Sequence, residues 1–233
     1  MSMSRYHRQM LLPEMGEARQ EKFRRARVLL IGAGGLGTPV ALALTGAGIG
    51  TLGIVDDDAV GLTNLHRQLL YDETVIGQPK AEMARERLHR LNSEVNLHAY
   101  PLRITQANAE TLLEGYDIVV DTCDNFQTRY LLDDLCQARK TPYIYGAVGG
   151  WEGQVSVFHY GDLPRRYRDL FPDEAMLQTL PAPGKEIMAS TTGVVGNVMA
   201  QQVFEIVGGF GEPLAGKLWT INLLTLQSMI LEF

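Results

Sequence analysis

The stretch Gly32-Ala33-Gly34-Gly35-Leu36-Gly37 decides the fold of this 233-residue chain. The apolar run of residues 28–31 precedes it, and residues 36–47 are small, apolar and compatible with a helix. Strand, tight turn and helix in this order form the opening unit of a nucleotide-binding α/β sheet. The N-terminus of such a helix points free N–H groups and the positive end of its dipole at an anion.

The glycines of the turn are the predicted phosphate cradle, and they are Gly32, Gly34, Gly35 and Gly37. Gly34 would let the backbone approach a phosphate, and Gly37 would let the helix pack closely. Glycine turns of this kind are common, so this one does not decide between a dinucleotide and ATP as the ligand.

Strand and helix patterns alternate after the turn. Continuous apolar runs predict strands that are buried on both faces, as in a parallel sheet. The predicted strands are residues 51–55, 95–100, 116–121 and 142–146, and the predicted helices are residues 82–91 and 126–139. The sequence therefore indicates an α/β fold with a doubly wound, mostly parallel, Rossmann-like sheet.

The pattern changes after Gly150. Residues 154–158, 218–222 and 227–231 predict strands without crossover helices between them, so we expect antiparallel strands at the C-terminal end of the sheet. Residues 162–190 carry four prolines and predict a long loop. We expect one domain over residues 1–233, with an N-terminal arm over about residues 1–26.

The composition limits the environment and the partners of the chain. Its formal net charge is −6 and its sequence pI is about 5.4, which argues against nucleic acid as a partner. The basic clusters at residues 22–27 and 165–168 are interpreted as solvated charges. No apolar run reaches the ~20 residues that a membrane helix needs, and no signal peptide is evident. We therefore expect a cytoplasmic protein.

The acid Asp56 follows the second predicted strand and opens the stretch of residues 56–68, Asp-Asp-Asp-Ala-Val-Gly-Leu-Thr-Asn-Leu-His-Arg-Gln. A carboxylate at this place can accept hydrogen bonds from ribose hydroxyls. The alternative is an ordinary turn residue at a strand end.

Two cations favour ATP over a dinucleotide. A helix N-terminus largely satisfies a pyrophosphate, whereas a triphosphate needs arginine, lysine and a divalent ion. Arg67 offers a planar fork for phosphate oxygens and Lys80 a compact charge. The alternative for each is ordinary surface charge.

The acid Asp124 follows the strand predicted over residues 116–121. Carboxyl ends of strands line the ligand crevice of an open sheet, so Asp124 could hold Mg²⁺. It could instead cap the next helix, and both roles are open if Asn125 is the cap.

Six motifs in order resemble the ThiF/MoeB/HesA family. They are Arg5-Tyr6-His7-Arg8-Gln9, the glycine turn, residues 56–68, Gln78-Pro79-Lys80, Thr122-Cys123-Asp124-Asn125 and Glu152-Gly153-Gln154. The resemblance implies ATP-dependent adenylation of the C-terminal Gly-Gly carboxylate of a small ubiquitin-like sulfur-carrier protein, which yields an acyl adenylate and pyrophosphate. It implies thiamine biosynthesis, with molybdopterin biosynthesis as the second pathway.

The resemblance also assigns residues, with ATP and Mg²⁺ as cofactors. Asp56 would bind ribose; Asn64, Arg67 and Lys80 would bind the phosphates; Gln68 would also line the nucleotide site; and Asp124 would hold the magnesium. Arg8 matches an arginine that family members insert from the neighbouring subunit, which implies a homodimer with two composite sites.

Departures from the family pattern change two expectations, a zinc site and a covalent link to the carrier. Family members commonly hold zinc with two Cys-x-x-Cys pairs, but this chain has only Cys123 and Cys136, so no zinc is predicted. Arg166 and Asp169 take the place of the first pair. They are interpreted as exposed loop charges, and the alternative is that they pair electrostatically.

A covalent link to the carrier is not expected either. Ala189 occupies the position of the cysteine that thiamine-pathway members can link to the carrier. Cys123 and Cys136 are interpreted as packing groups, and the five histidines as structural.

Two alternatives remain at this point. One is a related ATP-dependent enzyme that acts on modified tRNA, and a basic surface would support it. The other is a non-catalytic or NAD-binding protein of the same fold. The combination of Arg67, Lys80 and Asp124 argues against this second alternative.

Overall fold

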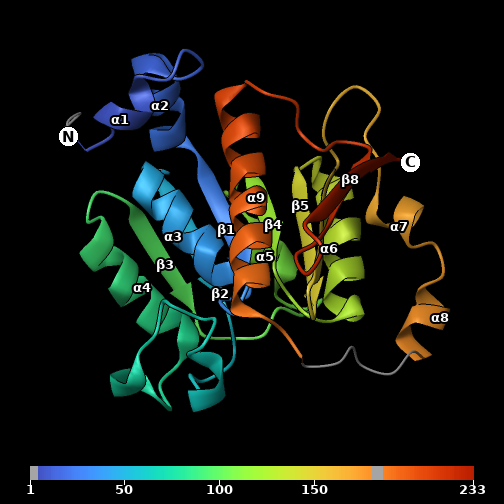
Figure 1. Ribbon diagram of the computed structural model, residues 1–233, viewed down its shortest axis with the longest axis horizontal. Helices are drawn as coiled ribbons and strands as arrows, with labels where there is room; N and C mark the ends of the chain where they lie inside the picture. Colours follow the sequence, from blue (N-terminus) through green and yellow to red (C-terminus); the bar gives the residue numbers. More distant parts are fainter. Residues whose placement is uncertain (1–4, 180–185) are drawn as a thin grey trace.

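The computed structural model describes residues 5–179 and 186–233 of the chain, which form one eight-stranded sheet with helices on both faces (Figure 1). The strands are β1 (Arg27–Ile31), β2 (Thr51–Val55), β3 (Asn96–Tyr100), β4 (Ile118–Asp121), β5 (Tyr143–Gly149), β6 (Glu152–Phe158), β7 (Lys217–Asn222) and β8 (Gln227–Glu232). The α-helices are α1 (His7–Met10), α2 (Gly16–Arg25), α3 (Gly37–Ala47), α4 (Lys80–Leu91), α5 (Ala109–Leu113), α6 (Phe126–Arg139), α7 (Tyr167–Leu170), α8 (Glu174–Thr179) and α9 (Ala189–Gly208). No helix within these ranges has the length and apolarity that crossing a bilayer requires.

The strand order β3-β2-β1-β4-β5-β6-β7-β8 confirms the predicted doubly wound sheet. The first five strands in this order are parallel, and β6, β7 and β8 are antiparallel to their neighbours, as predicted. The chain moves outward from β1 to β3 and then crosses to β4 on the other side of β1. The carboxyl ends of β1 and β4 therefore flank the switch point, where open sheets bind ligands.

Alternate residues of β1 enter two separate cores. Val28 and Leu30 pack with α3 and α9 on one face, whereas Leu29 and Ile31 pack with α5 and α6 on the other. All four side chains are buried, with exposed fractions of 0–3%. Burial on both faces explains why the strand sequence is a continuous apolar run.

One prediction is wrong, because the helix α9 lies between β6 and β7 where no crossover helix was expected. Its sequence contains several glycines, threonines and valines, which are weak helix formers. Gly196 serves packing here, since a Cβ at this position would lie 2.4 Å from Pro39 Cγ of α3. The tertiary contact between α3 and α9 overrides the local propensity.

The predicted loop over residues 162–190 contains the short helices α7 and α8 and the first residues of α9, while residues 180–185 lie outside the described part. The interpretation of Arg166 as an exposed loop charge is wrong. Its guanidinium lies 2.9 Å from Asp134 and 3.3 Å from Asp133, both on α6. Asp169 accepts a hydrogen bond from the Arg166 backbone N–H. The basic cluster at residues 165–168 is thus partly paired with acids, because α6 packs beside it.

Asp133 is the centre of this contact and has no exposed surface. Its carboxylate accepts hydrogen bonds of 2.8 Å from His159 Nε2 and from the Tyr167 backbone N–H. Burial acts to raise the pKa of Asp133, but these hydrogen bonds and the charges of His159 and Arg166 hold it below its ordinary value. Asp133 therefore fixes the start of α7 to α6.

Asp133→Asn is expected to lower the free energy of unfolding by about 3 kcal/mol at pH 7, since it removes one charge of a buried pair. Because the folded-state pKa of Asp133 is depressed, its contribution is complete above about pH 5 and is lost as the pH falls through that folded-state pKa. Denaturant unfolding at pH 7 and at pH 3.5 should show a smaller difference between variant and wild type at pH 3.5. Asp134→Asn, at an exposed neighbour, is the control and should cost under about 1 kcal/mol. An Asp133→Asn difference that is the same at both pH values would refute this account.

Candidate functional site

The glycine turn closes tightly at the switch point. Gly32 has φ +95°, and a Cβ at Gly37 would lie 2.1 Å from the Gly32 carbonyl oxygen, so both positions require glycine. The Thr122 hydroxyl, just after β4, lies 2.8 Å from the carbonyl oxygens of both Ile31 and Gly32. The turn is thereby fixed to the end of β4, with the N-terminus of α3 behind it.

Arg67 and Gln68 lie over the turn. A Cβ at Gly35 would meet Arg67 Cδ and Nε at 3.4 Å, and a Cβ at Gly34 would meet Gln68 Nε2 at 3.5 Å. Gln68 is buried, and its Oε1 has no hydrogen-bond partner. Arg67 Nη1 donates to the Thr63 carbonyl oxygen, which holds the guanidinium beside the glycines. The structure thus brings together an amide, a guanidinium and the predicted cradle.

Asn64 shapes the segment that carries these two side chains. Its Oδ1 accepts a hydrogen bond from the Gly61 N–H, and its carbonyl oxygen accepts from the N–H groups of Arg67 and Gln68. Its carboxamide therefore has a structural partner, and its predicted contact with phosphate stays a prediction.

Asp56 connects the turn to β2. Its carboxylate accepts hydrogen bonds from the Ala33 N–H at 2.7 Å and from the Asp58 N–H at 2.9 Å. Burial raises the pKa of Asp56, and the N–H groups and Lys80 offset only part of this effect. Each oxygen of the carboxylate has a further lone pair, so the structural role is compatible with the predicted ribose contact.

Lys80 is almost fully buried, at 4% exposure, and its Nζ lies 2.8 Å from Asp58 Oδ2. The Lys80 N–H also donates to the Asp58 carbonyl oxygen. The Tyr71 hydroxyl lies 2.9 Å from the Ala33 carbonyl oxygen and 3.3 Å from that of Lys80, so it joins the start of α4 to the glycine turn. Lys80 is therefore held at the same edge of the sheet as Arg67 and is not an ordinary surface charge.

Asp124 is exposed just after β4. The side chain of Asn125 is the helix cap, because its Oδ1 accepts a hydrogen bond of 2.9 Å from the Thr128 N–H of α6. Asp124 therefore does not cap α6, which was the alternative role that the sequence left open. Its magnesium role stays a prediction.

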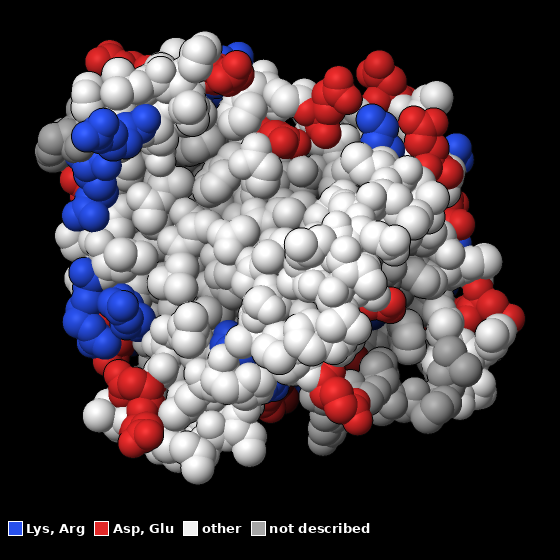
Figure 2. All heavy atoms as spheres, in the orientation of Figure 1, with Lys and Arg blue, Asp and Glu red and all other residues white. Residues whose placement is uncertain are grey.

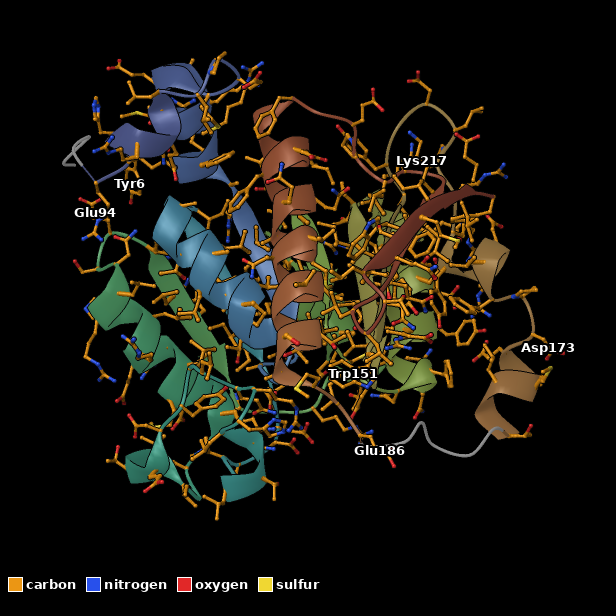
Figure 3. The ribbon with its side chains drawn as sticks, in the orientation of Figure 1. Tyr6, Glu94, Trp151, Asp173, Glu186 and Lys217 are labelled. Carbon is orange, nitrogen blue, oxygen red and sulfur yellow. The ribbon has the colours of Figure 1, made fainter. Side chains whose placement is uncertain are left out.

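Arg8 does not join the other predicted residues. It is exposed on α1, and the adjacent Gln9 donates to the Ala47 carbonyl oxygen at the end of α3. The glycine turn lies at the opposite end of α3, which is about 16 Å long. In Figure 3, Tyr6 and Glu94 lie on the upper left of the molecule, whereas Trp151, which follows the carboxyl end of β5, lies in its lower middle. One protomer therefore does not bring its own Arg8 to its switch point.

Cys136 is buried and Cys123 is partly buried. Burial is the main cause of a raised pKa for each thiol, and the nearby Asp121 acts in the same direction. A thiol with a raised pKa is a poor nucleophile at neutral pH. Ala189 lies at the start of α9.

The sequence interpretation missed several residues of this edge, namely Asp58, Tyr71, Asp121, Thr122 and Arg129. The run of three acids at residues 56–58 gave a signal for Asp58, and the polar residue directly after β4 gave one for Thr122. Tyr71 lies in an irregular segment, and only the fold brings its hydroxyl to Ala33.

The arrangement of side chains around the glycine turn fits a nucleoside triphosphate. Glycines leave space beside Arg67, the donor Gln68 Nε2 lies over Gly34, and Asp124 offers an exposed carboxylate. In the described residues, no group of three or more His, Cys, Asp or Glu side chains forms a metal site. A metal ion at Asp124 would therefore need further ligands from water and phosphate, as Mg²⁺ commonly takes.

Sequence comparisons identify relatives over nearly the whole chain. A model of the ThiF family matches residues 6–233. The chain is 43% identical to the sulfur carrier protein adenylyltransferase of Thermus thermophilus, over 93% of this chain and 82% of that protein. It is 44% identical to the adenylyltransferase and sulfurtransferase MOCS3 of Culex quinquefasciatus, over 92% of this chain, and spans about half of that protein, 49%. It is 37% identical to a probable molybdopterin-synthase adenylyltransferase of Gracilaria tenuistipitata, over 94% of this chain and 62% of that protein.

Solved structures agree on the fold. The structure of E. coli MccB with ATP has a TM-score of 0.78 and 25% identity, and the match covers 92% of this chain and 65% of that one. The structure of PaaA has a TM-score of 0.85 and 23% identity, over 99% of this chain and 73% of that one.

Gly34→Ala is expected to leave stability nearly unchanged, because its Cβ would meet only the flexible end of Gln68. The added methyl group would fill the space of an approaching phosphate, so we expect ATP affinity to fall about tenfold or more, measured by calorimetry. Gly37→Ala is the contrasting variant, because its Cβ would meet backbone and the thermal unfolding midpoint should fall strongly. A similar loss of stability in both variants, or full ATP affinity in Gly34→Ala, would contradict the assignment of the cradle.

Proposed function

The chain belongs to the ThiF family and is a nucleotidyltransferase, and from this premise we propose that it adenylates the C-terminal carboxylate of a small sulfur-carrier protein with ATP. The observation that carries the proposal is the joint position of the glycine turn, Arg67 and Lys80 around the switch point. A dinucleotide would not need both cations, so this position supports ATP over NAD.

The residues of the site match the demands of adenylyl transfer. The attacking carboxylate and the α-phosphate are both anionic, so the main tasks are alignment and neutralisation of charge. In the proposal, the N-terminus of α3 and Arg67 bind phosphate oxygens, and Lys80 stabilises charge near the reacting phosphorus. Asp56 accepts hydrogen bonds from the ribose hydroxyls. Bound Mg²⁺, held by Asp124, would supply further positive charge to the phosphates.

The carrier is the less defined part of the proposal. We propose a ubiquitin-like carrier that ends in Gly-Gly, in thiamine or molybdopterin biosynthesis. The names of the relatives support a sulfur carrier and include a molybdopterin-synthase adenylyltransferase. Their names leave both pathways open for this chain.

We also propose that the active form is a homodimer. Arg8 lies far from the switch point of its own protomer, so only another copy of the chain could bring it there. Figure 2 shows a face over α3 and α9 whose centre is nearly free of charged side chains. Pro39, Leu42 and Ala43 of α3 and Val194 and Val198 of α9 are only partly covered or exposed. An apolar helix usually has a covering partner, which supports this face as the contact between copies.

The adenylation proposal predicts carrier-dependent exchange between ATP and pyrophosphate. Exchange should appear with Mg²⁺ and a carrier that ends in Gly-Gly, and carriers of the two pathways are compared. Asp124→Ala should reduce exchange about 100-fold or more. Glu114→Ala, an exposed acid before the opposite end of β4, should leave it unchanged. Measurable ATP binding without exchange for any carrier would overturn the proposal and favour the tRNA-acting relative or a non-catalytic role.

The dimer proposal predicts complementation between two inactive variants. Arg8→Ala and Asp124→Ala damage different subunits of a composite site, so a mixed dimer keeps one intact site. Co-expression of the two should restore about a quarter of the wild-type exchange, because half of randomly paired dimers are mixed. Each variant alone is the control. No recovery, with mixed dimers verified by two different affinity tags, would mean that Arg8 does not act across the interface.

A further inference from the structure

Arg129 is a buried cation beneath the segment that carries Asp124. It closes the first turn of α6, and only 9% of its side chain is exposed. Its Nη2 donates a hydrogen bond of 2.8 Å back to the Cys123 carbonyl oxygen. The guanidinium also lies 5.1 Å from the ring centre of Tyr145 and 5.7 Å from that of Phe126.

Asp121, the last residue of β4, supplies the other half of this contact. Its Oδ1 accepts a hydrogen bond of 2.9 Å from the Cys123 N–H, and its Oδ2 accepts one of 2.6 Å from the Tyr143 hydroxyl. Arg129 Nε lies 3.9 Å from the same Oδ2. The backbone N–H and carbonyl of Cys123 are therefore held by a buried acid and a buried arginine, directly before Asp124.

Stability alone does not account for this pair. Burial of two charges costs about as much as their attraction returns, and apolar side chains of similar size are often as stable. Arg129 Nε is buried and has no hydrogen-bond partner, so the pair is not arranged for maximal stability. What the pair provides is a fixed backbone at Cys123.

We propose that Arg129 is a positioning residue that, with Asp121, fixes the backbone at residues 123–125 and so directs the Asp124 carboxylate to magnesium-bound ATP. The inference rests on the proposed function for the role of Asp124. Partners that orient a metal ligand typically contribute about 10–100-fold to metal affinity. Arg129 acts through the backbone, so its effect should appear in the magnesium dependence and not in the binding of the free nucleotide.

The test compares Arg129→Lys and Arg129→Gln with the wild-type protein. The readout is the rise in thermal unfolding midpoint that ATP causes, titrated with Mg²⁺ and repeated with EDTA. We expect the half-saturating Mg²⁺ concentration to rise about 10–100-fold in Arg129→Gln and less in Arg129→Lys, which keeps the charge. The shift with ATP and EDTA should stay as in the wild type.

Tyr145→Phe is the matched control, because it keeps the ring beside Arg129 and removes only a hydroxyl that bonds with Gln154. It should titrate like the wild type. If Arg129→Gln does not fold, Arg129→Lys carries the test. An unchanged half-saturating Mg²⁺ concentration in the folded variants would overturn the proposal, as would an equal loss of ATP binding with and without Mg²⁺. Absence of carrier-dependent exchange in the wild type would count against the proposed function alone, since this readout needs no carrier.

Discussion

The contact between Gly37 and the carbonyl oxygen of Gly32 is the constraint on which the site depends. A Cβ at Gly37 would lie 2.1 Å from that oxygen, so any other residue would open the turn. Closure of the turn places the N-terminus of α3 at the end of β1, beside the end of β4. The helix dipole and free N–H groups then face the switch point of the sheet. Arg67, Asp56 and Thr122 all take their positions from this turn.

Polar side chains around the turn form hydrogen bonds within the protein itself. Asp56 holds Ala33, Asn64 holds Gly61, and Tyr71 joins Ala33 to Lys80. Buried polar groups are costly unless they are paired, and these pairs are formed within the protein. The site is therefore largely preformed, which lowers the entropy that a ligand would lose on ordering it.

The regular part of the fold was predictable from the sequence, whereas several contacts were not. The strands around β1 are continuous apolar runs, and their parallel arrangement was predicted and confirmed. Helix α9 was missed because Gly196 serves a contact with α3 that sequence periodicity does not express. The position of Lys80 at this edge was expected, but its pairing with Asp58 was not, since residues 56–58 offer three acids in a row. The Asp133 contact was also missed, because it joins α6 to a segment more than 30 residues away.

The charges at this edge bear on the proposed magnesium and the proposed dimer. Asp56, Asp57, Asp58 and Asp124 gather there, and Lys80 is already paired with Asp58. Of the two predicted cations, Arg67 alone has no carboxylate partner among the ion pairs of the described residues. Repulsion between these acids and a triphosphate would have to be offset by charge from elsewhere. A divalent ion at Asp124 and an arginine from a second copy would both supply positive charge. The magnesium and the dimer of the proposed function would therefore offset the same repulsion.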